Sequence, residues 1–315
     1  MHAPIFTAAF VLLLAFLLLF GSPNQMAFAQ DAPLGQIDIP GPAGSVQFGQ
    51  HVVTLPNGNF VVVDPMHDEG VVYSVGAVYL YDGETLQLIS RLTGSNAFDR
   101  VGNGGITLLT NGSFVVSSVD WSDGTSAATG AVTWIDAISG LAGTVSAANS
   151  LVGSAVDDGV GNGGVTALPN GNYVVRSPEW RGAASAGIVG AVTWGNGTTG
   201  TTGVVSSDNS LVGSTYSDDV GARDITVLSN GNYSVSTPSW DDGFTSDAGA
   251  VTWSSGTSGV KGAISAANSL VGITEGDSVG SDGITVLSNG NYVVRSSSWN
   301  NGATADAGAV TWGNG

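Results

Sequence analysis

The chain has 315 residues, of which 48 are glycine and only 10% are charged, and its formal net charge is -18. Because it contains just 7 lysines and arginines, it has no basic surface for phosphate backbones, which excludes nucleic-acid binding. It has no cysteine, so disulfides and thiolate metal sites are excluded too. The 42% of hydrophobic residues is enough for a core, so the chain is not predicted to be an acidic disordered tail.

Residues 1–29 are predicted to be a secretory signal peptide. An unbroken apolar run extends from Phe10 to Phe20, and the small-x-small triplet Ala27-Phe28-Ala29 follows it. An uncleaved membrane anchor is the alternative, but the apolar stretch from Ile5 to Phe20 has 16 residues and a span needs ~20. We therefore expect a secreted or cell-surface protein, with no membrane contact after cleavage. A mature chain that is acidic and free of cysteine favours a bacterial source.

The chain after residue 45 consists of one motif written five times. The dipeptide Asn-Gly recurs at Asn57, Asn111, Asn170, Asn230 and Asn289, and two families of four tryptophans recur with the same spacing. A repeat of this length indicates a propeller, a solenoid or an array. The predicted copies are 46–94, 95–153, 154–213, 214–272 and 273–315, the fifth of which lacks its last segment. A cut from a longer array is an alternative explanation of that fifth copy.

Each copy is predicted to form four short β-strands. In the fifth copy, Ile284–Leu287 leads into Asn289-Gly290 and then into Tyr292–Arg295. Asn-Gly between two β-rich runs is a strong hairpin signal and predicts a primed turn with positive φ at both central residues. Gly308–Trp312 is the expected third strand, and Ile264–Val271 in the fourth copy is an expected fourth strand. No window has a sustained helical period, so helices are expected to be nearly absent.

Four antiparallel strands every 59 residues or so predict an all-β protein, a β-propeller of four-stranded blades. A β-solenoid is the competing prediction. Residues 30–45 are an N-terminal segment in which Gln36–Ile39 reads as a strand. We hypothesise that this strand completes the fifth blade and closes a five-bladed ring, which would remove the open sheet edges.

The motifs resemble two known repeat types. Phe48-Gly49, Leu55–Val62 and Gly76–Tyr81 look like the FG-GAP blade of integrin-α-type propellers. The later copies, with Asn-Gly-Asn-Tyr-Val-Val, a downstream Trp and Gly-Ala-Val-Thr-Trp, resemble a bacterial repeat of unknown function from secreted proteins of the filamentous-haemagglutinin type. The resemblance covers residues 46–315 and implies an adhesion-type role. The Asp-rich calcium loop of FG-GAP blades is missing from the Asn-Gly-Asn turn.

The two tryptophan families have different predicted roles. The family in the third strand lies on the apolar face of an alternating strand, which predicts core rings between blades. It comprises Trp134, Trp194, Trp253 and Trp312. The family in the loop after the second strand either anchors that loop or forms exposed platforms that bind sugar rings. It comprises Trp121, Trp180, Trp240 and Trp299.

One aspartate recurs two residues before each Val-Gly pair, at Asp99, Asp158, Asp218 and Asp277. The structural interpretation is an Asx-type turn in which the side chain caps local N–H groups. The functional alternative is one Ca²⁺ ligand per copy, helped by an adjacent acid such as Asp157 or Glu275. Since Ca²⁺ needs six to eight oxygens, two acids per copy favour the structural interpretation.

The sequence predicts no catalytic residues. No nucleophile elbow or pair of metal-binding histidines is present. We therefore expect a non-enzymatic, exported binding module of adhesion type, with glycans or surface proteins as partners. A secreted glycan-acting enzyme and a purely structural spacer are the alternatives. An enzyme would need a carboxylate cluster in one copy only, and the sole candidate is the first-copy patch of Asp64, His67, Asp68 and Glu69.

Overall fold

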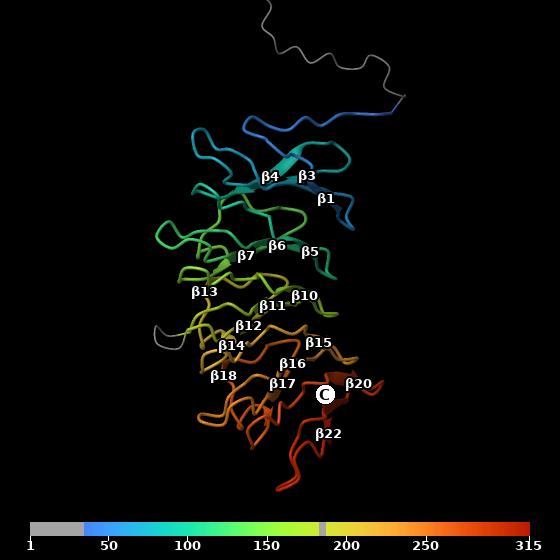
Figure 1. Ribbon diagram of the computed structural model, residues 1–315. Helices are drawn as coiled ribbons and strands as arrows, with labels where there is room; N and C mark the ends of the chain where they lie inside the picture. Colours follow the sequence, from blue (N-terminus) through green and yellow to red (C-terminus); the bar gives the residue numbers. More distant parts are fainter. Residues whose placement is uncertain (1–34, 183–186) are drawn as a thin grey trace, which may run out of the picture. The chain divides into compact units, whose positions relative to one another are not determined.

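The computed structural model describes residues 35–182 and 187–315, so the predicted signal peptide lies outside the described residues. The chain divides into Met1–Ile39 and Pro40–Gly315. Of the first unit, Gly35–Ile39 is described, and it contains no strand. All regular structure in the described part of the second unit is β (Figure 1). No helix in these described ranges has the length and apolar character needed to cross a bilayer.

The five repeats contribute strands in the predicted order, but the predicted fourth strand Ile264–Val271 is confirmed only at Leu270–Val271. The first strands are β1 (His51–Thr54), β5 (Gly105–Leu108), β10 (Gly164–Ala167), β15 (Thr226–Val227) and β20 (Ile284–Val286). The second strands are β2 (Phe60–Asp64), β6 (Phe114–Ser118), β11 (Tyr173–Ser177), β16 (Tyr233–Thr237) and β21 (Tyr292–Ser296). The third strands are β3 (Ala77–Tyr81), β7 (Ala131–Ile135), β12 (Ala191–Gly195), β17 (Ala250–Ser254) and β22 (Ala309–Gly313). The fourth strands are β4 (Leu88–Thr93), β9 (Leu151–Val152), β14 (Ser210–Val212) and β19 (Leu270–Val271).

The predicted hairpins between first and second strands are confirmed, but their turns are not primed. β1 pairs with β2 in antiparallel register, and the N–H of Leu55 donates to the carbonyl of Asn59 at 2.8 Å. Only Gly58 has positive φ in this turn (+92°), so Asn57 does not adopt the left-handed conformation. The loop is the longer type in which a single left-handed glycine forms a bulge before the second strand.

Successive sheets are joined by a short strand that the sequence did not predict. β8 (Gly143–Thr144), β13 (Gly203–Val204) and β18 (Gly262–Ala263) each leave their own repeat and pair in parallel with the fourth strand of the preceding one. The chain then returns to form the fourth strand of its own sheet. Each of these strands therefore fastens a repeat to the edge of its predecessor.

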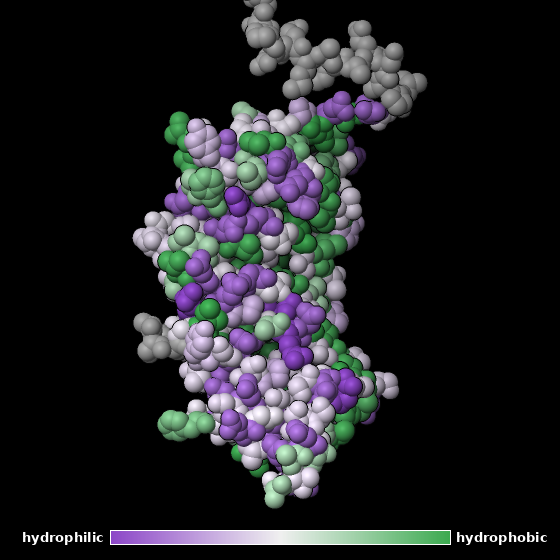
Figure 2. Space-filling view, in the orientation of Figure 1, coloured by the Kyte–Doolittle hydropathy of each residue, from purple (hydrophilic) through white to green (hydrophobic). Residues whose placement is uncertain are grey.

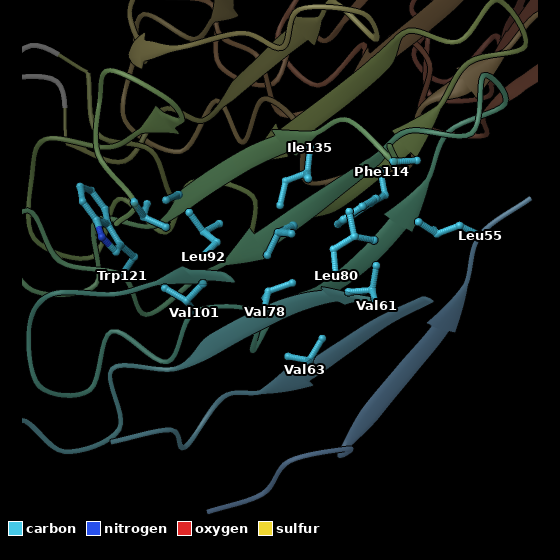
Figure 3. Packing of buried hydrophobic residues seen from close by; sticks show 14 of the residues in the cluster. Leu55, Val61, Val63, Val78, Leu80, Leu92, Val101, Phe114, Trp121 and Ile135 are labelled. Atoms are coloured by element: carbon cyan, nitrogen blue, oxygen red, sulfur yellow. The ribbon is translucent and has the colours of Figure 1, made fainter. Parts of the chain in front are cut away.

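The core lies between successive sheets, which follow one another in chain order (Figure 1). In the first interface, Val61, Val78 and Leu80 of the first sheet face Phe114 and Ile135 of the second (Figure 3). Residues that alternate with these along the second sheet, such as Val115 and Val132, pack on the third sheet. Inner sheets are therefore buried on both faces, because successive side chains of a strand point to opposite faces.

The two outer faces of Pro40–Gly315 are not packed against each other. Phe48 covers the first sheet, with its ring centroid 5.4 Å from that of Tyr79 and 6.3 Å from that of Tyr81. On the last sheet, Val310 and Trp312 are 75% and 59% exposed. No described sheet closes into a barrel, so the propeller is not confirmed; the structure shows an all-β fold of five repeats, each a small sheet.

The hypothesis of a closing N-terminal strand is wrong for this structure. Gln36–Ile39 has no strand conformation, and the fifth sheet consists of β20, β21 and β22 alone. Proline residues follow the segment at Pro40 and Pro42, and a proline has no N–H to donate to a ladder.

The buried tyrosines of the second strands make stability sensitive to alkaline pH. Burial raises the pKa of Tyr173 and of Tyr233 from 10.0 to about 12. Because the raised pKa belongs to the folded state, their contribution is complete below pH 10 and is lost as the pH rises toward 12. The expected loss is about 2 kcal/mol for each ring at the upper end of this window.

Denaturant unfolding measured from pH 9 to 12 tests this expectation, and the double variant Tyr173→Phe/Tyr233→Phe is the control. The variant should show a shallower loss of stability than the wild type over the same window. Equal slopes for the two proteins would contradict the assignment to these tyrosines.

Candidate functional site

Two kinds of loop lie at the same end of the antiparallel sheets and form what is here called the loop edge. It comprises the loops between second and third strands and the loops that join one repeat to the next. Backbone hydrogen bonds join the two kinds of loop. The N–H of Phe98 donates to the carbonyl of Tyr73 at 3.1 Å, and the N–H of Ser217 donates to the carbonyl of Ile188 at 2.8 Å. The loop edge is therefore continuous from one repeat to the next.

The recurring aspartates fasten the loop edge. Asp99, Asp158, Asp218 and Asp277 are fully buried. In each, Oδ2 accepts two backbone N–H groups from the residues three and four positions earlier, at Asp158 from Ser154 and Ala155, both at 2.8 Å. Oδ1 accepts the N–H of the residue after the loop tryptophan, which for Asp158 is Arg181 at 2.9 Å. One carboxylate thus joins the loop that connects two repeats to the loop between the second and third strands of the later repeat.

The glycine before each connecting loop makes this close contact possible. A Cβ added at Gly153 would lie 2.3 Å from the carbonyl oxygen of Thr129 and 2.7 Å from the Cβ of Asp158. The equivalent contacts recur at Gly94, Gly213 and Gly272. The Ser-Leu-Val-Gly segments therefore end in glycine because no larger residue fits between the loop and the aspartate.

Burial and hydrogen bonding oppose each other at these carboxylates. At Asp99, desolvation raises the pKa above its ordinary value, although the N–H groups of Asn96, Ser95 and Ser122 counteract part of the rise. At Asp277, desolvation acts in the same direction, but hydrogen bonds from Thr274, Asn300 and Ile273 outweigh it and lower the pKa. The carboxylate oxygens are occupied by backbone donors in both cases.

This arrangement does not favour the calcium alternative. Ca²⁺ requires free oxygen ligands, whereas these oxygens accept N–H groups. Within residues 35–182 and 187–315, no group of three or more His, Cys, Asp or Glu side chains has an arrangement that could hold a metal ion.

The loop tryptophans are buried, so they are not exposed platforms. Trp121, Trp180 and Trp240 are 5%, 7% and 3% exposed and belong to the clusters between sheets, and Trp299 is half-buried against the last of these clusters. In Figure 3, Trp121 lies at one end of the first cluster. This burial agrees with the alternative in which the rings anchor the loop, and it leaves no exposed stacking surface at Trp121, Trp180 and Trp240.

The third-strand tryptophans are more exposed than their core role predicted. Trp134 and Trp194 are half-buried at the margins of two clusters, and their Nε1 groups donate to the carbonyls of Gly197 and Gly256 in the following repeat, at 2.9 and 3.0 Å. Trp253 is 38% exposed. These rings connect repeats at the side of the sheet rather than at its centre.

The loop edge exposes large apolar side chains that the sequence analysis missed. Among its described residues, the exposed aromatic side chains are Tyr73, Phe98, Tyr216 and Phe244, and the exposed aliphatic ones include Val71, Val156 and Ile273. Figure 2 shows apolar and polar residues interspersed over this view of the described surface. The exposed aromatics do not recur at equivalent positions of every repeat, so a consensus of the repeats hides them.

Beneath the loop edge lies a row of three cavities whose walls combine hydroxyl-bearing residues with apolar ones. They have volumes of 660, 440 and 360 Å³ and belong to the first, second and third repeats. Ser95 lines both the first and the second, and Ser154 lines both the second and the third. Trp121 and Trp180 contribute to the walls of the second and third.

The first cavity is the only one of the three with a pair of opposite charges in its wall. Arg91 Nη2 donates to Glu69 Oε2 at 2.9 Å, and both side chains line the cavity. His67 is buried behind them, with Nε2 3.5 Å from Glu69 Oε2. Asp64 accepts the N–H groups of Val46 and Gln47, both at 3.0 Å.

Asp68 also has a structural role, because it accepts the N–H of Ser74 at 2.8 Å. Of the predicted patch, the structure therefore brings His67 and Glu69 together with Arg91, which the sequence analysis did not single out. Asp64 and Asp68 hold the backbone that surrounds these residues.

The fold and the fastened loops define an all-β protein of tandem repeats, each repeat a small sheet that packs on its neighbours. The chain matches the family described as a repeat of unknown function (DUF5650) over residues 54–103, 108–162, 167–222, 227–281 and 286–315. It belongs to this family, with five copies of the repeat. The match supports the resemblance to a repeat of unknown function but brings no support for a likeness to FG-GAP or haemagglutinin proteins. A comparison with curated proteins found no match.

The buried carboxylates can be tested at Asp158. Asp158→Asn replaces an acceptor oxygen of the carboxylate by an NH₂ group beside backbone donors, so we expect a loss of about 2 kcal/mol in the free energy of unfolding. The neighbouring Asp157→Asn is the matched control, because Asp157 is exposed and asparagine tolerates its φ of +61°. Urea unfolding of both variants measures the difference, and equal stabilities would contradict the role assigned to Asp158.

Proposed function

We propose that the protein is an exported, non-enzymatic binding module that recognises glycan chains through its loop edge. The exposed aromatic side chains of the loop edge carry this proposal. Tyr73 and Tyr216 are 64% and 68% exposed, and Phe244 is fully exposed. Aromatic rings offer apolar area at a small cost in conformational entropy, which suits them to stacking on the C–H faces of sugars.

The setting of these rings supports the same partner. A Cβ added at Gly187 would lie 2.9 Å from Tyr216 Cδ2, so this ring rests on the backbone of the neighbouring loop. The Arg100 guanidinium lies 5.8 Å from the centroid of the Phe98 ring. The serine and threonine residues in the walls of the cavities below supply donors and acceptors of the kind that sugar hydroxyls require.

The net charge and the predicted signal peptide agree with a role outside the cell. A charge of -18 keeps the chain soluble and repels anionic polymers, so neutral glycans are the preferred partners. The loops carry the variable side chains while the sheets stay alike, which is the usual division of labour in binding proteins.

The arrangement of carboxylates favours binding over glycan hydrolysis. Glycosidases commonly use two carboxyl groups on either side of the scissile bond. In the first repeat, Asp64 and Asp68 accept backbone N–H groups, which leaves Glu69 as the single carboxylate on the cavity wall.

The packing of the first sheet favours an open array of repeats over a closed propeller. Phe48 covers the face of the first sheet on which the last sheet would have to pack to close a ring.

A glycan array and sedimentation with insoluble neutral polysaccharides test this proposal. Tyr216→Ser/Phe244→Ser should weaken binding at least about tenfold, because both changes remove stacking area without touching the core. The control Val52→Ser/Leu108→Ser removes exposed apolar side chains from the first strands, away from the loops, and should leave binding unchanged. Absence of wild-type binding on both assays would favour a structural spacer.

A further inference from the structure

The first repeat departs from the others at three neighbouring positions. In the second, third and fourth repeats, a threonine of the third strand and a serine at or just before the start of the fourth strand have hydroxyls 2.6 to 2.7 Å apart. In the first repeat, the residues in the same register are Tyr79 and Arg91. His67 stands where the second repeat has the loop tryptophan Trp121. The backbone N–H of His67 donates to the carbonyl of Asp64, and its carbonyl accepts the N–H of Gly76. Trp121 makes the same two backbone hydrogen bonds, with Ser118 and Gly130.

These replacements form one connected polar group. Tyr79 Oη lies 3.2 Å from His67 Nδ1, and Arg91 Nη1 lies 3.5 Å from His67 Nε2. His67 is fully buried, so it holds the guanidinium in place from behind. Glu69, which pairs with Arg91 from the other side, is 52% exposed at its side chain. No described residue donates a hydrogen bond to Glu69 Oε1, which leaves this oxygen available to a ligand.

The cavity in front of this pair combines polar and aliphatic walls. Ser90, Thr93, Ser95 and Thr144 line it together with Val72 and Leu88. Its volume of 660 Å³ exceeds the 440 and 360 Å³ of the equivalent cavities in the next two repeats. This volume lies within the range of cavities that bind small molecules, about 300 to 1,000 Å³.

We infer that the first-repeat cavity is a binding site for the terminal residues of a neutral sugar chain. A carboxylate and a guanidinium side by side can accept from and donate to adjacent hydroxyls of one sugar, and the aliphatic wall can cover its C–H face. Glu69 and the charge of -18 disfavour an anionic ligand. The choice of a sugar rests on the proposed function, and the site adds recognition of a chain end to binding along the loop edge.

Maltose, cellobiose, lactose and N,N′-diacetylchitobiose are suitable probes, with glucuronic acid as the anionic comparison. Saturation-transfer NMR and calorimetry on the full chain should show binding of at least one neutral disaccharide. Glu69→Gln and Arg91→Gln should each weaken that binding at least about tenfold, because each removes a charge-assisted hydrogen bond. Asp123→Asn, at the equivalent of Glu69 in the second repeat, is the matched control and should bind like the wild type.

Binding of none of the neutral disaccharides would overturn the inference, as would stronger binding of glucuronic acid. Wild-type affinity in both the Glu69→Gln and the Arg91→Gln variant would overturn it too. Glu69 is exposed, so its variant should fold even if Arg91→Gln does not. Tyr216→Ser/Phe244→Ser should retain disaccharide binding. If that variant also retains polymer binding, the proposed function of the loop edge fails while the first-repeat site stands.

Discussion

The structure depends on one constraint, which is that each small sheet must pack against its neighbours in the chain, so that the inner sheets bury both faces. The strands have two to six residues and the sheets three to five strands, too little to be stable in isolation. Stability in such a protein is the sum of each repeat and its nearest-neighbour interfaces. The alternation of Val115 and Val116, one facing each neighbour, is the direct expression of this constraint.

The loop edge follows from the same constraint. Once the sheets are packed, consecutive loops lie close enough for a single carboxylate to accept N–H groups from two of them, as Asp158 does. A buried carboxylate that receives three backbone donors needs no counter-ion nearby, which is consistent with a chain so poor in lysine and arginine. The fastening leaves the loop tips free to vary, and the exposed aromatics Tyr216 and Phe244 occupy such tips.

The first repeat departs from the pattern for a physical reason. No sheet precedes it within Pro40–Gly315, so its outer face is covered by Phe48 instead, and larger rings, Tyr79 and Tyr81, occupy the third strand beneath it. Tyr79 reaches His67, and His67 in turn reaches Arg91. The same departure that adapts the repeat to its cover therefore places a charged pair at the largest of the three cavities.

The sequence by itself determined the number of repeats, the order of their strands and the hairpins, because these depend on the repeat period and on contacts within a few residues. Asn57-Gly58 is a local signal of this kind, whereas the recurring aspartates combine a local contact with one to a distant loop, as Asp158 does with Ala155 and Arg181. Only the tertiary structure decided which tryptophan family is buried, because burial of Trp121 depends on a loop and a sheet from other parts of the chain. It also decided the parallel strand β13, the open row of sheets and the cavity beside Glu69, since each requires residues far apart in sequence to meet. The repeat period and the turns depend on residues that are neighbours in the sequence, whereas the exposure of a side chain depends on what packs against it in the folded chain.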